Sequence, residues 1–299
     1  MTDEEDRAPA SEQAPISLRG RLATVYFPAL LGGSERALAS RLGDRATTYH
    51  PRLGAAAGLA AIEEHLTKLG QWLAGARASY VHQQEIVGVD RDVTEGVLSL
   101  RVPPSNPARA GGAGGAGAAE IDQTGARLSI ALPVACVMHR RKGRKADLRA
   151  YHAMLPLGGW QAPRSPREAH DGEDGYVLAA DIAEHLAALR LGDAEALVAG
   201  FEREGHLRDG AGRVHPLEGG ALHAFYVATL QSERGANDWV PLVIAAADNG
   251  RCCAVEYTTE KLRGGESAPK EGLVIFERGD SGRLRSVRMY DELGLSSRE

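Results

Sequence analysis

The chain has 299 residues, a formal net charge of −5 and only 5% aromatic residues, so its cores must be built mainly from Leu, Val and Ala. A pI near 6.1 excludes the extended basic surface that nucleic-acid binding requires. Three cysteines without a CxxC pair, and apolar runs too short to span a bilayer, predict a cytoplasmic protein with no membrane partner.

The first half of the chain combines predicted helices with predicted strands. Residues 1–17 are acidic and have no apolar core, so we expect a disordered tail. Apolar residues at helical spacing predict helices within 18–42 and over 59–73. Segments rich in Val, Ile and Leu predict strands near 79–89, 93–102, 127–139 and 147–157. The Ala/Gly tract 107–119 has little to bury, and we expect a flexible hairpin insertion.

The second half repeats this pattern after a charged, proline-containing linker, 159–175. Helices are predicted over 176–201 and 219–232. Strands are predicted near 239–248, 251–260, 268–278 and 283–291.

An internal repeat underlies this order. Residues 29–38 (ALLGGSERAL) match 188–197 (ALRLGDAEAL) without a gap, and 132–155 lie over 268–291, again without a gap. The second match sets Arg149 against Arg285. Each unit runs helix, helix, then a mostly antiparallel meander, so the predicted class is α+β, with units at 18–158 and 176–295.

The stretch 206–212 (HLRDGAG) places one carboxylate, Asp209, in an otherwise apolar region. An Asp between helices and a sheet, beside a glycine-rich turn, is a candidate base in a pocket. The alternative is a turn in which Asp209 accepts hydrogen bonds from its own backbone, which is common before Gly. The sequence leaves both interpretations open.

Both halves resemble the nuclear transport factor 2-like superfamily, which includes ketosteroid isomerase and the SnoaL-like polyketide cyclases. The second half carries the resemblance best, in 189–193 (LRLGD), 207–212 (LRDGAG), 268–272 (APKEG) and 287–291 (VRMYD). The resemblance implies two tandem cone-shaped α+β barrels, each with one pocket and with no need of a cofactor.

Residue by residue, the resemblance places Asp209 at the catalytic base, Glu271 at the protonated acid and His185 at the oxyanion tyrosine. The last two are departures, with Glu in place of Asp and imidazole in place of phenol. In an apolar cavity, loss of hydration raises a carboxyl pKa, which would improve Asp209 as a base and keep Glu271 neutral as a donor.

The first unit departs further from the family pattern. It has Tyr26, His50 and Ala135 at the corresponding positions, so the second acid is lost and an imidazole replaces the carboxylate base. Tyr26 and His50 are then a weak acid–base pair that contacts substrate. We expect this unit to be degenerate, or to serve in binding or docking.

Four further residues of the second unit are predicted to contact substrate: Tyr226, Tyr257, Arg288 and Tyr290. Arg288 and Tyr290 share one face of the last strand. If that face is concave they line the pocket, and if it is convex they belong to an interface.

Three functions stay open. The first is a small-molecule isomerase or cyclase that moves a proton through Asp209 on an apolar or polyketide-like ligand. The second is a polyether-type epoxide hydrolase or cyclase, for which Glu233 would face Asp209. The third is a non-catalytic ligand-binding or dimerisation module. We expect no metal site, because the histidines lack ligand spacing, and either a homodimer or intramolecular pairing of the units.

Overall fold

The structure, a computed structural model, describes residues 21–102, 120–121, 128–141, 145–154, 157, 178–231, 240–260 and 270–290. The predicted tail, the 107–119 insertion, the 159–175 linker and Glu233 lie outside these residues.

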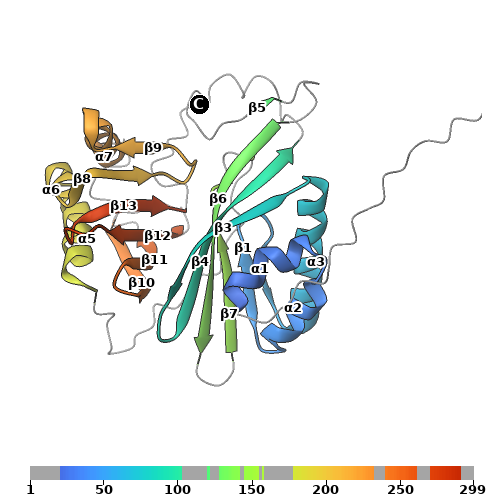
Figure 1. The fold of residues 1–299 in the computed structure, drawn as a ribbon. Coiled ribbons are helices and arrows are strands. Elements are labelled where there is room, and N and C mark those ends of the chain that lie inside the picture. The colour runs from blue at the N-terminus through green and yellow to red at the C-terminus, as the bar shows by residue number, and fades with distance from the viewer. Residues whose placement is uncertain are drawn as a thin grey trace, which may run out of the picture.

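In its described residues, the first unit packs three helices on a seven-stranded sheet (Figure 1). The helices are α1 (Leu22–Leu31), α2 (Glu35–Leu42) and α3 (Leu59–Gly75). The strands are β1 (Thr47–His50), β2 (Gly54–Ala57), β3 (Ser79–Val87), β4 (Arg91–Val102), β5 (Glu120–Ile121), β6 (Leu128–Arg141) and β7 (Lys145–Tyr151). The sheet order is β2-β1-β7-β6-β4-β3, with β5 against β6. The β1–β7 pair is parallel and the other pairs are antiparallel.

The second unit has the same plan. Its helices are α5 (Ala180–Leu191), α6 (Ala194–Ala199), the short 3-10 helix η2 (Glu218–Gly220) and α7 (Ala221–Gln231). Its strands are β8 (Phe201–Arg208), β9 (Val214–Pro216), β10 (Val240–Asp248), β11 (Cys252–Glu260), β12 (Lys270–Arg278) and β13 (Leu284–Met289). The order β10-β11-β12-β13-β8-β9 is the order of the first sheet read from β3, and here too one pair, β8–β13, is parallel.

The predicted class, two tandem α+β units, is confirmed, although neither sheet closes into a barrel. The β1–β2 and β8–β9 hairpins were not predicted, because β1, β2 and β9 have only three or four residues each and β8 (FEREGHLR) has few apolar residues. The helix predicted over 176–201 is two helices, α5 and α6. The chain instead leaves α5 at Gly192, whose φ of 70° lies in the left-handed region, and Asp193 caps α6 by accepting a bond from the Ala196 backbone.

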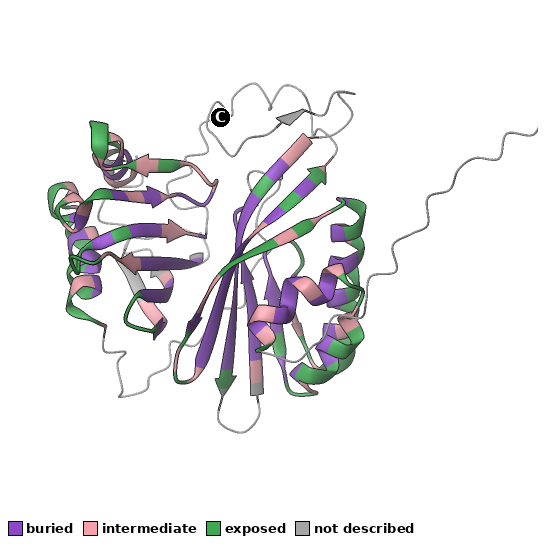
Figure 2. Cartoon of the chain, in the orientation of Figure 1, coloured by how far each residue is buried: buried purple, intermediate pink, exposed green. Residues whose placement is uncertain are grey.

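Each sheet has two buried faces. The face toward the unit's own helices carries that unit's core, and α3 contributes Ile62, Leu66, Leu69 and Leu73 at helical spacing. The opposite faces of the two sheets meet in the middle of the molecule, with the helices outside (Figure 1). Figure 2 shows the buried strand segments there. This third core contains Ile86, Val93, Ala135, Val137, Tyr151, Ala247, Cys252, Ala254, Leu273, Ile275 and Tyr290.

A buried polar network crosses the same interface in two copies. In the first copy, Glu256 of β11 accepts hydrogen bonds from Tyr151 (2.6 Å), Arg149 (3.2 Å) and Arg91 (3.0 Å) of the first unit. Burial opposes the charge on Glu256, but Arg149 and Arg91 hold the pKa of its carboxyl below the ordinary value.

In the second copy the units exchange roles. Glu95 of β4 accepts hydrogen bonds from Arg288 Nε (2.9 Å) and Nη2 (2.8 Å), and from the Tyr290 hydroxyl. In each unit, an Arg and a Tyr two residues apart therefore donate hydrogen bonds to a Glu of the other unit. Such reciprocity is the property of a two-fold interface between like subunits, here formed within one chain.

The strand pairing corrects which residues of the two units correspond in the gapless repeat. In the strand registers, Ala135 lies between Glu95 and Tyr151, and Leu273 lies between Glu256 and Tyr290. The counterpart of Ala135 is therefore Leu273 rather than Glu271. The counterpart of Arg149 is Arg288 rather than Arg285. A register shift between Glu277 and Arg278 accounts for one residue of the displacement.

Candidate functional site

Asp209 lies at the turn between β8 and β9, with its side chain fully buried. Its Oδ1 accepts from the backbone N–H groups of Ala211 (3.0 Å) and Arg213 (2.9 Å). Its Oδ2 accepts from Arg213 Nε at 2.7 Å and lies 3.2 Å from His215 Nε2. Gly212, with φ of +86°, lets the chain turn around the carboxylate.

Four donors around one carboxylate occupy all of its lone-pair directions. Of the two interpretations of the stretch, the turn that binds its own backbone is the one observed. An oxygen engaged in this way is poorly placed to accept a proton from a ligand. His215 was not predicted as a site residue, because its contact with Asp209 depends on the β8–β9 hairpin, in which His215 pairs with Leu207.

His185 lies on α5 among Phe201, Phe276 and Tyr226, with ring centroids 5.9, 5.3 and 6.0 Å away. Its Nε2 is 3.3 Å from the Tyr226 hydroxyl. Its Nδ1 is buried and has no hydrogen-bond partner among the described residues. Burial lowers the pKa of His185 to about 4, so the ring is neutral at pH 7.

Glu271 does not share this environment. It lies on β12, whose side chains alternate between the two faces of the sheet. Leu273 and Ile275, on the same face as Glu271, pack in the core between the sheets. Val274 and Phe276, on the other face, pack in the helix-side core of the second unit, where His185 lies. Glu271 is also among the groups that raise the pKa of Arg149 of the first unit. The structure therefore places Glu271 toward the interface and away from His185.

The other predicted contacts of the second unit divide between the same two faces. Tyr226 and Tyr257 are buried in the core on the helix side. Arg288 and Tyr290 contact Glu95 of the first unit, as the interface alternative predicts. The Arg208 guanidinium also lies over the Tyr290 ring, 5.0 Å from its centroid.

In the first unit, Tyr26 and His50 are both buried but are not hydrogen-bonded to each other. The Tyr26 hydroxyl has no partner in the described part of the chain. His50 accepts a bond from the Arg52 backbone at Nδ1 (3.2 Å), and its Nε2 is 3.4 Å from His152 Nε2. Burial, reinforced by His152, lowers the pKa of His50 well below its ordinary value. No motif in the sequence marks His152, which follows β7 and lies beside His50 because β7 pairs with β1 in parallel.

The buried histidines make stability depend on pH. Because the folded pKa of His185 is about 4 and the unfolded value is about 6.5, the unfolded chain binds the proton first as pH falls. Stability contributed by the neutral ring is complete above about pH 6.5 and is lost down to about pH 4.

We therefore expect His185→Phe, which keeps an aromatic ring in the cluster, to flatten the fall of unfolding free energy between pH 6.5 and 4.5. The difference in unfolding free energy between wild type and His185→Phe should change by roughly 2 to 3 kcal/mol between pH 6.5 and 4.5. Urea unfolding at several pH values measures it. Parallel curves for the two proteins would show that His185 does not titrate differently on folding.

No family model and no curated protein matches the chain. Solved structures similar to it include a protein from Sphaerobacter thermophilus (18% identity, TM-score 0.28), covering 38% of this chain and 95% of that one. The epoxide hydrolase/cyclase-like enzyme SalBIII, described for pyran ring formation in polyether salinomycin, has 16% identity and TM-score 0.31, covering 37% and 86%. A ketosteroid isomerase-like fold from Catenulispora acidiphila, in complex with trimethylamine, has 13% identity and TM-score 0.31, covering 44% and 85%.

No helix among the described residues is both long and apolar enough to cross a membrane. No group of three or more His, Cys, Asp or Glu side chains in that part of the chain is arranged to hold a metal ion.

Proposed function

We propose that the protein binds a small, largely apolar molecule inside the second unit and moves a proton on it, with His185 and Tyr226 as the groups that meet the ligand. The observation that carries this proposal is the buried Nδ1 of His185, which has no hydrogen-bond partner among the described residues, while Nε2 lies 3.3 Å from the Tyr226 hydroxyl. Buried polar atoms without a partner are rare in folded proteins, and a ligand or a bound water commonly completes them.

The pair can act in two tautomers. If Nε2 carries the hydrogen, it donates to Tyr226, the phenol hydrogen is free for a ligand oxygen, and Nδ1 is a base. If Nδ1 carries the hydrogen, it donates to the ligand and Nε2 accepts from Tyr226. The first tautomer offers a base beside an oxygen-binding donor, which suits proton abstraction next to a carbonyl. A pKa near 4 makes the imidazole about as basic as an ordinary Asp carboxylate.

The first unit has a buried polar atom at the matching position. Tyr26 aligns with His185 when the 29–38 and 188–197 match is extended backward, and its hydroxyl also has no partner among the described residues. Equivalent first helices thus direct a polar group into each interior. This supports ligand contact at that helix position. In our proposal His185 and Tyr226 take the acid–base role that the resemblance assigns to Asp209 and Glu271.

A β,γ-unsaturated cyclic ketone tests the proposal, because its conversion to the conjugated isomer requires one proton to leave the carbon next to the carbonyl and one to add at the γ carbon. We expect the full chain to catalyse this conversion, followed by absorbance of the conjugated ketone. His185→Phe should lower the rate by about 10²- to 10⁴-fold, the usual contribution of a general acid or base. Tyr226→Phe should lower it by less, because the base survives.

Asp209→Asn, assayed at a temperature where it is folded, is the discriminating variant. Retained turnover supports the His185–Tyr226 pair. Loss of turnover in Asp209→Asn with full activity in His185→Phe would identify Asp209 as the base and overturn the proposal. Ketone binding without turnover in wild type would remove the catalytic part and leave a ligand-binding module.

A further inference from the structure

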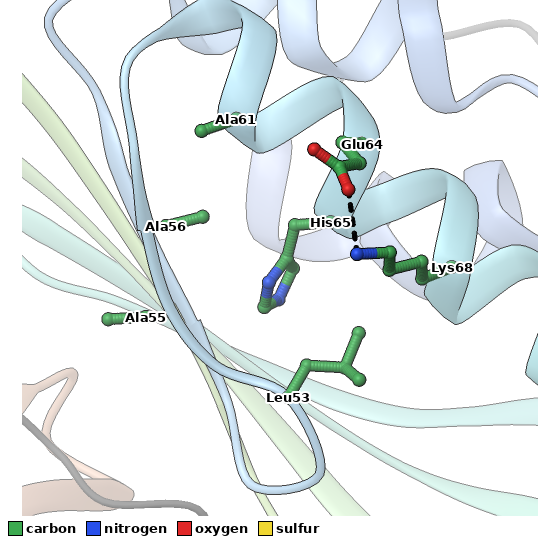
Figure 3. A pocket seen from close by; sticks show the side chains of 7 residues that line it. All are labelled: Leu53, Ala55, Ala56, Ala61, Glu64, His65 and Lys68. Carbon is green, nitrogen blue, oxygen red and sulfur yellow. Dashed lines mark ion pairs between the residues drawn. The ribbon is translucent and has the colours of Figure 1, made fainter.

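A second candidate site lies in the first unit, outside the His185 region. A cavity of about 210 Å³ opens between the β1–β2 hairpin and α3, beside the edge strand of the sheet. Figure 3 shows its walls: Leu53 and Ala55 come from the hairpin side, and Ala61 and His65 come from the helix. Small alanine side chains on facing elements leave the space.

His65 is the only imidazole that lines this cavity among the described residues. Its side chain comes from the buried face of α3, with 6% of the residue exposed, and it points into the space between helix and hairpin (Figure 3). Its Nε2 is buried and has no hydrogen-bond partner in the part of the chain that the structure describes. Burial and the nearby Lys68 charge lower the pKa of His65 to about 4, so the ring is neutral at pH 7.

The mouth of the cavity carries charges that neutralise each other. Glu64 and Lys68, one helical turn apart, form an ion pair at 2.7 Å with both side chains largely exposed (Figure 3). A charged ligand would therefore meet no free counter-charge and would lose hydration against Ala55, Ala56 and Ala61. The chemistry favours an uncharged molecule.

We propose that this cavity binds an uncharged, single-ring molecule whose hydroxyl group donates a hydrogen bond to Nε2 of His65. The volume is sufficient for a ring, because an enclosed apolar cavity of about 150 Å³ admits benzene, whereas this one is open to solvent on the side of Glu64 and Lys68. With the hydrogen on Nδ1, Nε2 accepts one hydrogen bond, which a phenolic or alicyclic hydroxyl supplies. The alanines and Leu53 cover the apolar part of the ring.

Phenol is the probe, with toluene as the ring of similar shape that lacks a hydroxyl. The fluorescence of Trp72 is the readout, because Trp72 lies two turns beyond His65 on α3. The Arg52 guanidinium is 5.0 Å and the His50 ring 6.1 Å from the centre of the Trp72 ring. We expect phenol to bind the full chain with a dissociation constant of about 1 mM or lower. The fluorescence change should vanish in Trp72→Phe, and the His65 ring nitrogen should shift in ¹⁵N spectra.

Two variants and one control decide the site. His65→Leu should weaken phenol binding by about ten-fold, a typical net hydrogen bond, and leave toluene binding unchanged. Ala61→Leu fills the cavity from an exposed helix position and should abolish phenol binding. Ala60→Leu, at a neighbouring position that does not line this cavity, should bind phenol as wild type does.

Three results would overturn the proposal. The first is phenol binding weaker than the stated limit. The second is equal affinity of wild type and His65→Leu for phenol, or an unshifted His65 nitrogen at saturation, which would mean that the hydroxyl does not meet Nε2. The third is undiminished binding by Ala61→Leu, which would place phenol elsewhere.

Discussion

Replacing Glu256 by alanine should lower the free energy of unfolding by about 3 to 5 kcal/mol, the usual cost of removing one partner from a buried ion pair. Glu256 is 2% exposed, and its loss leaves Arg91 and Arg149, themselves 2% and 3% exposed, without the carboxylate that both contact. The Tyr151 hydroxyl also loses its acceptor at 2.6 Å. Asp90 and Asp147 remain near the two arginines and offset part of the cost.

Urea unfolding of the full chain measures this effect. Glu256→Gln keeps an acceptor for Tyr151 and should cost less than Glu256→Ala. Glu195→Ala is the matched control, because Glu195 pairs with His223 at 3.0 Å but its side chain is 85% exposed, so the change should stay within about 0.5 kcal/mol. A loss below about 1 kcal/mol in Glu256→Ala would show that water reaches the interface and compensates the arginines.

Asp209→Asn should destabilise the second unit by about 2 to 4 kcal/mol. The asparagine oxygen can still accept from the backbone of Ala211 and Arg213, but its NH₂ group then faces two donors, Arg213 Nε and His215 Nε2. The Arg213 side chain is 39% exposed and can turn to water, which limits the cost. If Asp209 were instead a base in an apolar cavity, removing its charge would also remove a desolvation cost, and stability would not fall.

Thermal and urea unfolding of Asp209→Asn decide between these expectations. Asp193→Asn is the matched control, because Asp and Asn cap helices about equally well and Asp193 only caps α6. It should change stability by less than about 0.5 kcal/mol. Unchanged stability in Asp209→Asn would mean that the four contacts contribute little and would favour Asp209 as a catalytic group.

The sequence by itself determined the class of fold and its duplication. Apolar periodicity identified the long helices and strands, because each of these buries a whole face in a core. The 29–38 and 188–197 match placed Tyr26 and His185 at one position on the first helix of each unit. The turn alternative for Asp209 was also readable, because Asp before Gly in such a stretch commonly binds its own backbone.

Only the tertiary structure decided which face each strand residue occupies. The gapless repeat is displaced by two residues at Glu271 and by three at Arg149, so both were given the wrong counterparts. The strand register, with its bulge, identifies the correct ones. Glu95, Glu256 and Arg91 appeared as ordinary strand charges, because partners far apart in the chain meet only when the sheets pack. His65 and its cavity likewise depend on how α3 lies against the β1–β2 hairpin. The distance between two elements is a property of packing, and no local pattern of residues encodes it.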